Sequence, residues 1–321
     1  MNIVITGCAG FIGYHTTLFL LKKKFKIIGI DSINNYYDPN LKKNRLNILK
    51  KFNNFHFFKV DITEKNKLNN IFKKKIDIVI HLAAQAGVRY SLKAPEKYIN
   101  SNLNGFFNII EEAKIRKIKH FIFASTSSVY GYSNNFPLDE SFNTDEPLTL
   151  YAATKKSNEV IAYSYSNLYN LHCTGLRFFT VYGPYGRPDM ALFKFTKNII
   201  KNKYIELFNS GNHTRDFTYI DDVVISIYKL LKKPSRKKIP YQILNICSNN
   251  PISLKNFIKI IEKNLNLKAK IKNLELQKGD VKKTHGNNLK INNYLKNYKM
   301  VNIEDGISRF IIWYKSYYKI K

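Results

Sequence analysis

Tyr151 and Lys155 form the pair of residues in this chain whose types and spacing best suit proton transfer. If Tyr151 begins a helix, the two side chains lie four residues apart on one helix face. An ammonium group beside a phenol favours the phenolate and lowers a pKa that starts near ~10. The hydroxyl of Thr126 is then placed to share the same substrate oxygen. These three residues predict a proton-transfer site that works beside a hydride acceptor.

The Tyr-x-x-x-Lys spacing alone does not identify the site, because the chain is rich in both residues. The spacing recurs at Tyr228 with Lys232 and at Tyr317 with Lys321. Only the first pair follows a hydroxyl cluster, residues 125–128, at the end of an apolar run. Open α/β sheets bind ligands at the carboxyl ends of their strands. This context favours Tyr151 as the catalytic tyrosine.

A glycine-rich turn near the start of the chain is typical of a nucleotide site. The apolar run Asn2–Thr6 predicts a buried strand, and glycines spaced three apart follow it at Gly7, Gly10 and Gly13. Such a turn lets the backbone approach a diphosphate at a helix N-terminus, although a turn without a ligand has the same pattern. Asp31 ends the next strand, where its carboxylate binds ribose hydroxyls and repels a 2′-phosphate. The sequence therefore predicts NAD rather than NADP.

Strand and helix patterns alternate through residue 179. Predicted strands start at residues 2, 26, 55, 76, 120 and 173, with helices between them, the longest over 96–114 and 151–169. Repeated strand–helix units imply a Rossmann-type, doubly wound parallel sheet. We predict an NAD-binding domain over 1–180, to which segments near 215–247 return. Residues 181–321 are expected to form mainly a smaller α/β substrate lobe.

Two polar residues in these strands have competing interpretations. Asp61 follows the strand predicted over 55–60, where it either meets an adenine amino group or is simply a solvated strand-end acid. His81 lies inside an apolar run, so we interpret it as a hydrogen-bonded core histidine rather than a catalytic group.

Composition narrows the remaining function classes. The formal net charge of +30 permits a nucleic-acid partner, but the lysines are spread along the chain in an Asn- and Ile-rich background. We attribute the charge to compositional bias and expect no specific nucleic-acid partner. Three isolated cysteines favour a reducing compartment and neither disulfides nor a zinc site. With no basic segment before the first apolar run and no apolar stretch of ~18 residues, we expect a cytoplasmic protein without a membrane partner.

These motifs together resemble the extended short-chain dehydrogenases that act on nucleotide sugars, the NAD-dependent epimerase/dehydratase family. Within that family the chain is most similar to the 4-epimerases of UDP-glucuronate. Further stretches carry this similarity: residues 31–38, 81–91, 178–191, 215–222 and 279–280. The resemblance implies a 4-keto intermediate, a UDP-sugar substrate and bound NAD. It also implies a homodimer, because members of the family often dimerise through the helices that here begin at Glu96 and Tyr151.

The resemblance also implies a role for each matching position. Catalysis is expected at Thr126, Tyr151 and Lys155, the last two also facing the cofactor. The remaining cofactor contacts are expected at Gly7, Gly10, Phe11, Ile12, Gly13, Asp31, Asp61, Ile62, Leu82, Ala83, Ala84 and Asn102. Substrate contacts are expected at Arg89, Ser127, Ser128, Thr180, Arg187, Arg215 and Asp280. No metal ion is expected.

The reaction outcome is expected to depend on the residues after Thr126. Oxidation of UDP-glucuronate at C4 gives a β-keto acid, which loses carbon dioxide readily. Family members that decarboxylate or dehydrate typically carry an acid there, whereas this chain has Ser127 and Ser128. We therefore expect epimerisation to UDP-galacturonate for surface polysaccharide. The alternatives are another nucleotide-sugar epimerase or decarboxylase, and a non-catalytic NAD-binding sensor.

Overall fold

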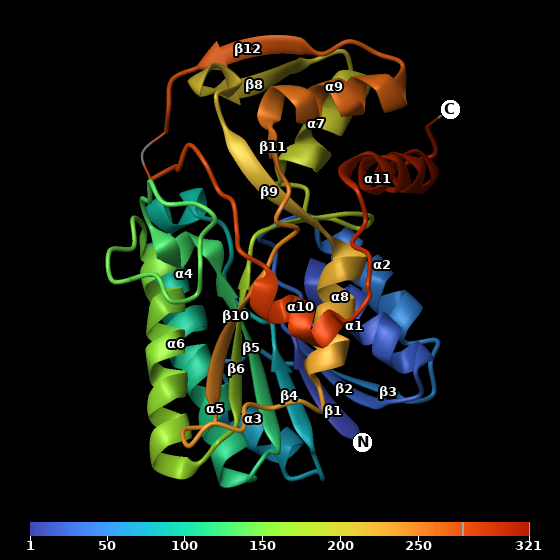
Figure 1. Ribbon diagram of the computed structural model, residues 1–321. Coiled ribbons are helices and arrows are strands. Elements are labelled where there is room, and N and C mark those ends of the chain that lie inside the picture. Colours follow the sequence, from blue (N-terminus) through green and yellow to red (C-terminus); the bar gives the residue numbers. More distant parts are fainter. Residues whose placement is uncertain (278, 321) are drawn as a thin grey trace.

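The computed structural model describes residues 1–277 and 279–320, and its centre is a seven-stranded sheet in which all neighbours are parallel (Figure 1). The strand order across the sheet is β10-β6-β5-β4-β1-β2-β3. The bounds are β1 (Asn2–Thr6), β2 (Lys26–Asp31), β3 (Phe55–Lys59), β4 (Ile78–His81), β5 (His120–Thr126), β6 (Cys173–Phe178) and β10 (Tyr241–Ile246). The predicted doubly wound α/β fold is confirmed.

Helices cover both faces of this sheet (Figure 1). On one side are α3 (Lys65–Phe72), α5 (Gly105–Ile115) and α6 (Leu150–Tyr169); on the other are α1 (Phe11–Lys22), α2 (Pro39–Leu49), α8 (Ile220–Leu230) and α10 (Leu289–Leu295). The centre of β1 is apolar because the strand is buried on both faces. Ile3 and Ile5 belong to one buried core and Val4 to the other, because successive side chains in a strand point to opposite faces.

A smaller group of elements lies beyond the carboxyl ends of the parallel strands (Figure 1). It contains a three-stranded sheet of β7 (Thr180–Tyr182), β9 (Thr214–Tyr219) and β11 (Pro251–Ser253), and a two-stranded sheet of β8 (Tyr204–Phe208) and β12 (Lys270–Leu274). Three helices pack with them: α7 (Ala191–Ile200), α9 (Leu254–Leu265) and α11 (Ile303–Tyr317).

The long helix predicted over 96–114 is interrupted. It consists of α4 (Pro95–Tyr98), a π-helical segment Ile99–Asn104 and then α5. Asn102, inside the π-helical segment, accepts a hydrogen bond from the Gln85 backbone N–H at 2.8 Å and donates to the Gln85 carbonyl at 3.1 Å. A π-helical turn re-aims side chains locally, and here it ties the helix to the loop after β4.

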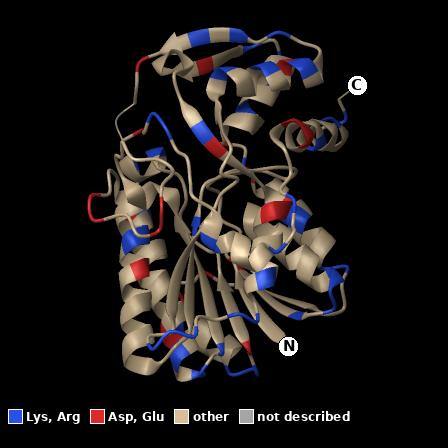
Figure 2. Cartoon of the chain, in the orientation of Figure 1, with Lys and Arg blue, Asp and Glu red and all other residues tan. Residues whose placement is uncertain are grey.

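Charged residues are spread over the molecule. Figure 2 shows lysines and arginines on the central sheet region and on the smaller group of elements alike. Among residues 1–277 and 279–320, no helix is long and apolar enough to span a membrane. Within the same ranges, no group of three or more His, Cys, Asp or Glu is arranged to hold a metal ion.

Candidate active site

A cavity of about 810 Å³ lies between the carboxyl ends of the parallel strands and the smaller group of elements. It is lined by the glycine turn, the Thr126–Tyr151–Lys155 set and the three predicted substrate arginines. Of the residues predicted for the site, all but Asn102 line this cavity. One cavity therefore brings together segments spread from residue 7 to residue 280.

The glycine turn has the backbone that a diphosphate site requires. Gly7 has a φ of 71°, and its N–H donates to the Ile30 carbonyl at 2.7 Å. A Cβ on Gly13 would lie 1.9 Å from the Gly7 carbonyl oxygen, so the turn closes only with glycine there. Helix α1 begins at Phe11, and its N-cap Gly10 makes no side-chain cap. Its first N–H groups therefore remain available for an anion, which fits the diphosphate of NAD.

Asp31 is positioned by backbone contacts on both carboxylate oxygens. Oδ2 accepts from the Ala9 N–H at 3.0 Å and Oδ1 from the Ile33 N–H at 2.8 Å. The carboxylate is thus held at the end of β2 beside the glycine turn, as a ribose contact requires. Asp61 also lines the cavity, and its Oδ1 accepts from the Thr63 N–H and hydroxyl at 3.0 and 2.8 Å.

The position of Asn102 differs from the predicted one. It was expected to line the cofactor channel, but it is 1% exposed and lies behind the channel wall. Its amide bonds the Gln85 backbone and donates to the Thr154 hydroxyl at 3.0 Å. Asn102 therefore supports the wall by joining α6 to the loop after β4. His81 is a buried histidine, as expected, with Nδ1 2.8 Å from the Thr6 hydroxyl; burial lowers its pKa to about 3.

Tyr151 and Lys155 lie in the first turns of α6. Thr149 caps this helix by accepting from the Ala152 N–H at 3.3 Å, which explains why the helix starts here. Lys155 is 2% exposed, and its ammonium donates to the Ala124 carbonyl at 3.0 Å. Thr126 ends β5, and its hydroxyl donates to Ser128 Oγ at 3.2 Å and accepts from the Ser128 N–H at 3.2 Å.

Burial opposes the predicted activation of Tyr151. Burial raises the pKa of Tyr151 above its usual value, while the Thr126 hydroxyl bond and the Arg187 charge act in the lowering direction. Burial lowers the pKa of Lys155 to about 8. Desolvation penalises the charged form of both groups, so their proximity along the helix does not by itself give a phenolate. The positive charge of Arg187 favours deprotonation of Tyr151.

Arg187 is held by two residues for which sequence reasoning gave no role. Its Nε donates to Asp189 Oδ1 at 3.0 Å, its Nη2 donates to Asp189 Oδ2, and the Tyr36 hydroxyl donates to the same carboxylate at 3.2 Å. Tyr36 and Asp189 both lie in stretches quoted for the family resemblance, at 31–38 and 178–191. Their position in these stretches was the sequence signal that could have identified them. A tyrosine or an aspartate does not by its type alone indicate a contact with Arg187.

A second charged cluster lies at another part of the cavity. Arg215 Nη2 donates to Asp280 Oδ1 at 2.9 Å, and Arg89 Nη2 donates to Asp280 Oδ2 at 3.4 Å. Two guanidinium groups thus share one carboxylate and leave a net positive charge. Planar guanidinium groups bind phosphate oxygens in pairs, so the cluster suits the diphosphate of a nucleotide sugar.

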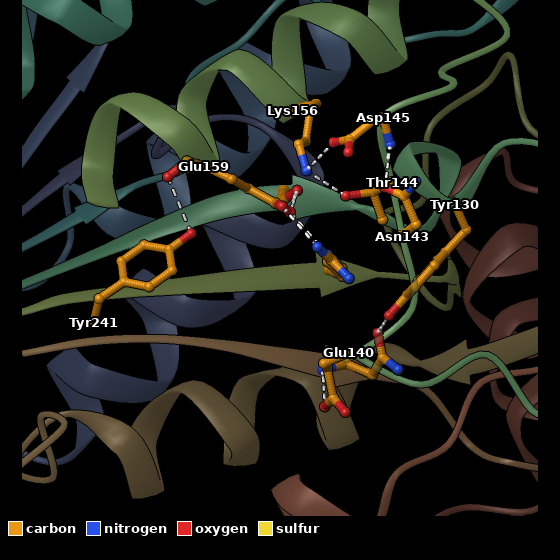
Figure 3. A network of polar contacts seen from close by, with 11 residues as sticks. Tyr130, Glu140, Asn143, Thr144, Asp145, Lys156, Glu159 and Tyr241 are labelled. Atoms are coloured by element: carbon orange, nitrogen blue, oxygen red, sulfur yellow. Dashed lines mark hydrogen bonds and ion pairs between the residues drawn. The ribbon is translucent and has the colours of Figure 1, made fainter. Parts of the chain in front are cut away.

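A network of polar contacts surrounds Glu159 (Figure 3). Glu159 accepts two bonds from Arg177, 2.9 Å from Nε and 2.8 Å from Nη2, and one from the Ser125 hydroxyl at 2.5 Å. The Tyr241 hydroxyl donates to the Glu159 backbone carbonyl at 3.0 Å. Glu159 is one turn after Lys155, and Ser125 precedes Thr126, so this network fixes α6 against β5 and β6.

Known proteins with similar sequences and structures include enzymes that act on UDP-sugars. Protein CapI of Staphylococcus aureus is 46% identical over 99% of this chain and 100% of its own length. A UDP-glucuronate 4-epimerase of Thermodesulfobacterium geofontis is 43% identical over 97% and 95%. The crystal structure of UDP-glucuronic acid 4-epimerase from Bacillus cereus, in complex with UDP-glucuronic acid and NAD, superposes with a TM-score of 0.91 at 34% identity, covering 99% of this chain and 100% of that one. The sequence model that describes the NAD dependent epimerase/dehydratase family matches residues 3–247, and this chain belongs to that family.

Proposed function

We propose that the protein is an NAD-dependent 4-epimerase that interconverts UDP-glucuronate and UDP-galacturonate. The observation that carries the proposal is the position of Tyr151. It lines one cavity with the glycine turn, and it is close enough to Thr126 and Arg187 for both to act on its pKa. The relatives named as UDP-glucuronate 4-epimerases support the choice of sugar.

The chain's own residues account for the proton steps. Tyr151, once deprotonated, takes the proton of the C4 hydroxyl, and the Thr126 hydroxyl hydrogen-bonds O4. NAD, when bound, supplies the acceptor and then the donor of the C4 hydride. The 4-keto sugar turns over in the cavity and Tyr151 returns the proton to O4. Arg187 and Lys155 stabilise the phenolate by their positive charge.

The sugar carboxylate is assigned to hydroxyl groups and one arginine. Ser127, Ser128 and Thr180 line the same cavity as Arg187. Neutral hydroxyls bind a carboxylate without repelling it, and they do not act as the acid or base that elimination needs. Holding the negative charge on the carboxylate opposes decarboxylation, in which the C5–C6 bond breaks and its electrons move into the C4 carbonyl. We therefore assign these residues to substrate recognition and to retention of C6.

Replacing Ser127 with alanine is expected to raise KM for UDP-glucuronate by roughly tenfold, because a hydrogen bond to a charged group contributes about 1.5–3 kcal/mol. The fraction of UDP-pentose among the products is expected to rise as well. Inhibition by UDP, which lacks the carboxylate, serves as the control and should change less than twofold. An unchanged KM for UDP-glucuronate would remove Ser127 from the carboxylate site.

Incubation of the purified enzyme with different UDP-sugars tests the proposed substrate. UDP-glucuronate should give UDP-galacturonate, while UDP-glucose and UDP-N-acetylglucosamine should turn over far more slowly. Predominant release of UDP-pentose would identify a decarboxylase instead, and preferred turnover of UDP-glucose would identify a different epimerase. If the protein binds NAD but converts none of these sugars, the alternative of a non-catalytic NAD-binding sensor would be favoured.

The proposal includes a homodimer formed through α5 and α6. These helices pack against each other, and they expose large apolar side chains: Phe107 at 45%, Val160 at 57% and Tyr163 at 47%. A face of this kind is typical of an interface between subunits. Val160→Glu is expected to convert a dimer into a monomer in analytical ultracentrifugation. Ile312→Glu, at an exposed apolar position on α11, should leave the dimer intact. A wild-type monomer at micromolar concentration would contradict the assignment.

We further assign residues 1–180 to NAD binding, with 215–247 contributing, and 181–321 mainly to the nucleotide sugar. The three cysteines are buried and unpaired, which supports a reducing cytoplasm as the location. The product is an activated sugar acid, so the expected next step is its transfer to a polysaccharide.

A further inference from the structure

Arg45 is a buried cation to which the proposed reaction assigns no role. It lies on α2, is 0% exposed, and is among the largest fully buried side chains. Among residues 1–277 and 279–320, no carboxylate forms an ion pair with it. Burying a charge without a counter-ion costs several kcal/mol unless strong hydrogen bonds replace water. The hydrogen bonds of Arg45 therefore indicate why this position carries a charge.

The guanidinium group joins two loops that are far apart in the sequence. Nη1 donates to the Ala9 carbonyl at 2.8 Å and to the Tyr37 hydroxyl at 2.7 Å. Nη2 donates to the Tyr185 carbonyl at 2.6 Å and to the Gly186 carbonyl at 3.4 Å. Ala9 lies in the glycine turn, and Gly186 immediately precedes Arg187. A planar fork with fixed donor directions reaches both loops at once.

On the cofactor side, Arg45 controls the orientation of a peptide unit within the turn. The Ala9 N–H is held by Asp31 and the Ala9 carbonyl by Arg45. The carbonyl oxygen carries partial negative charge, so a carbonyl facing the diphosphate would repel it. Arg45 keeps this oxygen directed into the protein, away from the anion that the turn is built to receive.

On the substrate side, Arg45 stabilises a strained loop. Tyr185 has a φ of 55°, a left-handed conformation that side chains other than glycine adopt at a cost. This conformation presents two successive carbonyls, Tyr185 and Gly186, to one guanidinium. His15, on α1, adds a contact between its Nε2 and the Pro184 carbonyl at 2.8 Å. The loop that carries Arg187 is thus anchored on the same elements that form the glycine turn.

We propose that Arg45 is a positioning residue that couples NAD binding to binding of the sugar carboxylate. The inference rests on the proposed function, because it requires an acidic sugar at Arg187. When the glycine turn is ordered around the diphosphate, Ala9 fixes Arg45, and Arg45 fixes the loop before Arg187. The coupling is reciprocal: bound UDP-glucuronate must strengthen NAD binding by the same factor.

The test measures NAD dissociation from the holoenzyme in a Tyr151→Phe background, which blocks turnover. Equilibrium dialysis gives the dissociation constant of NAD alone, with saturating UDP-glucuronate and with saturating UDP. The parent is expected to hold NAD at least about fivefold tighter with UDP-glucuronate, the low end of typical coupling. Adding Arg45→Met should reduce that factor to below twofold, while the smaller effect of UDP stays unchanged. Arg45→Lys keeps the charge but loses the fork and should restore only part of the coupling.

Leu49→Ala provides the matched control for stability. Leu49 is on the same helix, is 0% exposed and touches neither loop through a hydrogen bond. This variant should lower the melting temperature yet keep the full coupling factor. Coupling that survives in Arg45→Met, or that is lost equally in Leu49→Ala, would overturn the inference. Failure of UDP-glucuronate to bind the parent at all would instead remove the proposed function, and the inference with it.

Discussion

Replacing Tyr151 with phenylalanine is expected to lower kcat for epimerisation by about 10²–10⁴-fold, the usual contribution of a positioned acid–base group. The change removes one hydroxyl and leaves the ring, so α6 and its contact with Tyr98 should persist. Since burial raises the pKa of Tyr151, the wild-type rate is expected to increase with pH while the tyrosine titrates. Stopped assays of UDP-galacturonate formation across pH measure both effects.

The chain provides a matched control for this variant. Tyr228 has the same spacing to Lys232, but it lies in α8 and packs against Phe19, with 5.2 Å between ring centroids. Tyr228→Phe should leave kcat within a factor of two. The third pair ends at Lys321, which lies outside the described residues. Full activity in Tyr151→Phe would remove Tyr151 as the acid–base group.

The second large effect is expected from the ion pair behind the site. Replacing Glu159 with glutamine leaves the Arg177 charge buried without its carboxylate, because both side chains are at most 5% exposed. Breaking a buried pair in this way is expected to lower the free energy of unfolding by about 3–5 kcal/mol. It should also lower kcat, since Ser125 and α6 lose a shared anchor beside Thr126 and Tyr151.

The ion pair of Lys156 with Asp145 serves as the comparison (Figure 3). Lys156 lies on the same helix, three residues before Glu159, but the Asp145 side chain is 69% exposed. Asp145→Asn should change the free energy of unfolding by less than about 1 kcal/mol. Urea unfolding of the NAD-saturated proteins measures both variants. Equal effects would contradict the account of Glu159 as a buried anchor.

The elements that the sequence predicted best have strong local signals. Strands β1, β4, β5 and β6 are largely apolar because they are buried on both faces, and the glycine turn admits few alternative structures. Helix α9 (Leu254–Leu265) has apolar residues that recur on one face, so its bounds follow from the local sequence pattern.

The missed elements have weaker local signals. Helix α2 begins at Pro39 after the N-cap Asp38, but its Lys- and Asn-rich sequence hides its few buried residues. Helix α11 buries Ile307, Phe310, Ile311 and Tyr314, but charged residues lie between them and make this apolar face hard to recognise in the sequence. In both helices, packing against elements distant in the sequence decides which residues are buried. A short stretch of sequence does not contain that information.

The sequence indicated which residues form the candidate site better than it indicated their charge interactions and pKa shifts. Long-range pairs such as Arg187 with Asp189 and Arg45 with Tyr185 depend on how loops meet. Burial reversed the expected pKa shift of Tyr151, and burial cannot be deduced from a four-residue spacing. The scarcity of arginine in a lysine-rich chain was a usable signal. It directed attention to the loop arginines, and applied consistently it would have included Arg45 and Arg177.

The central claim is that one hydride leaves C4 of the bound sugar and returns to the same carbon. The most direct measurement follows UDP-glucuronate deuterated at C4 through complete epimerisation in ordinary water, with NMR and mass spectrometry of the product. The account predicts UDP-galacturonate that retains the deuterium at C4 and all carbon atoms of the sugar. Exchange of the label with solvent, or a product that has lost C6 as carbon dioxide, would contradict it.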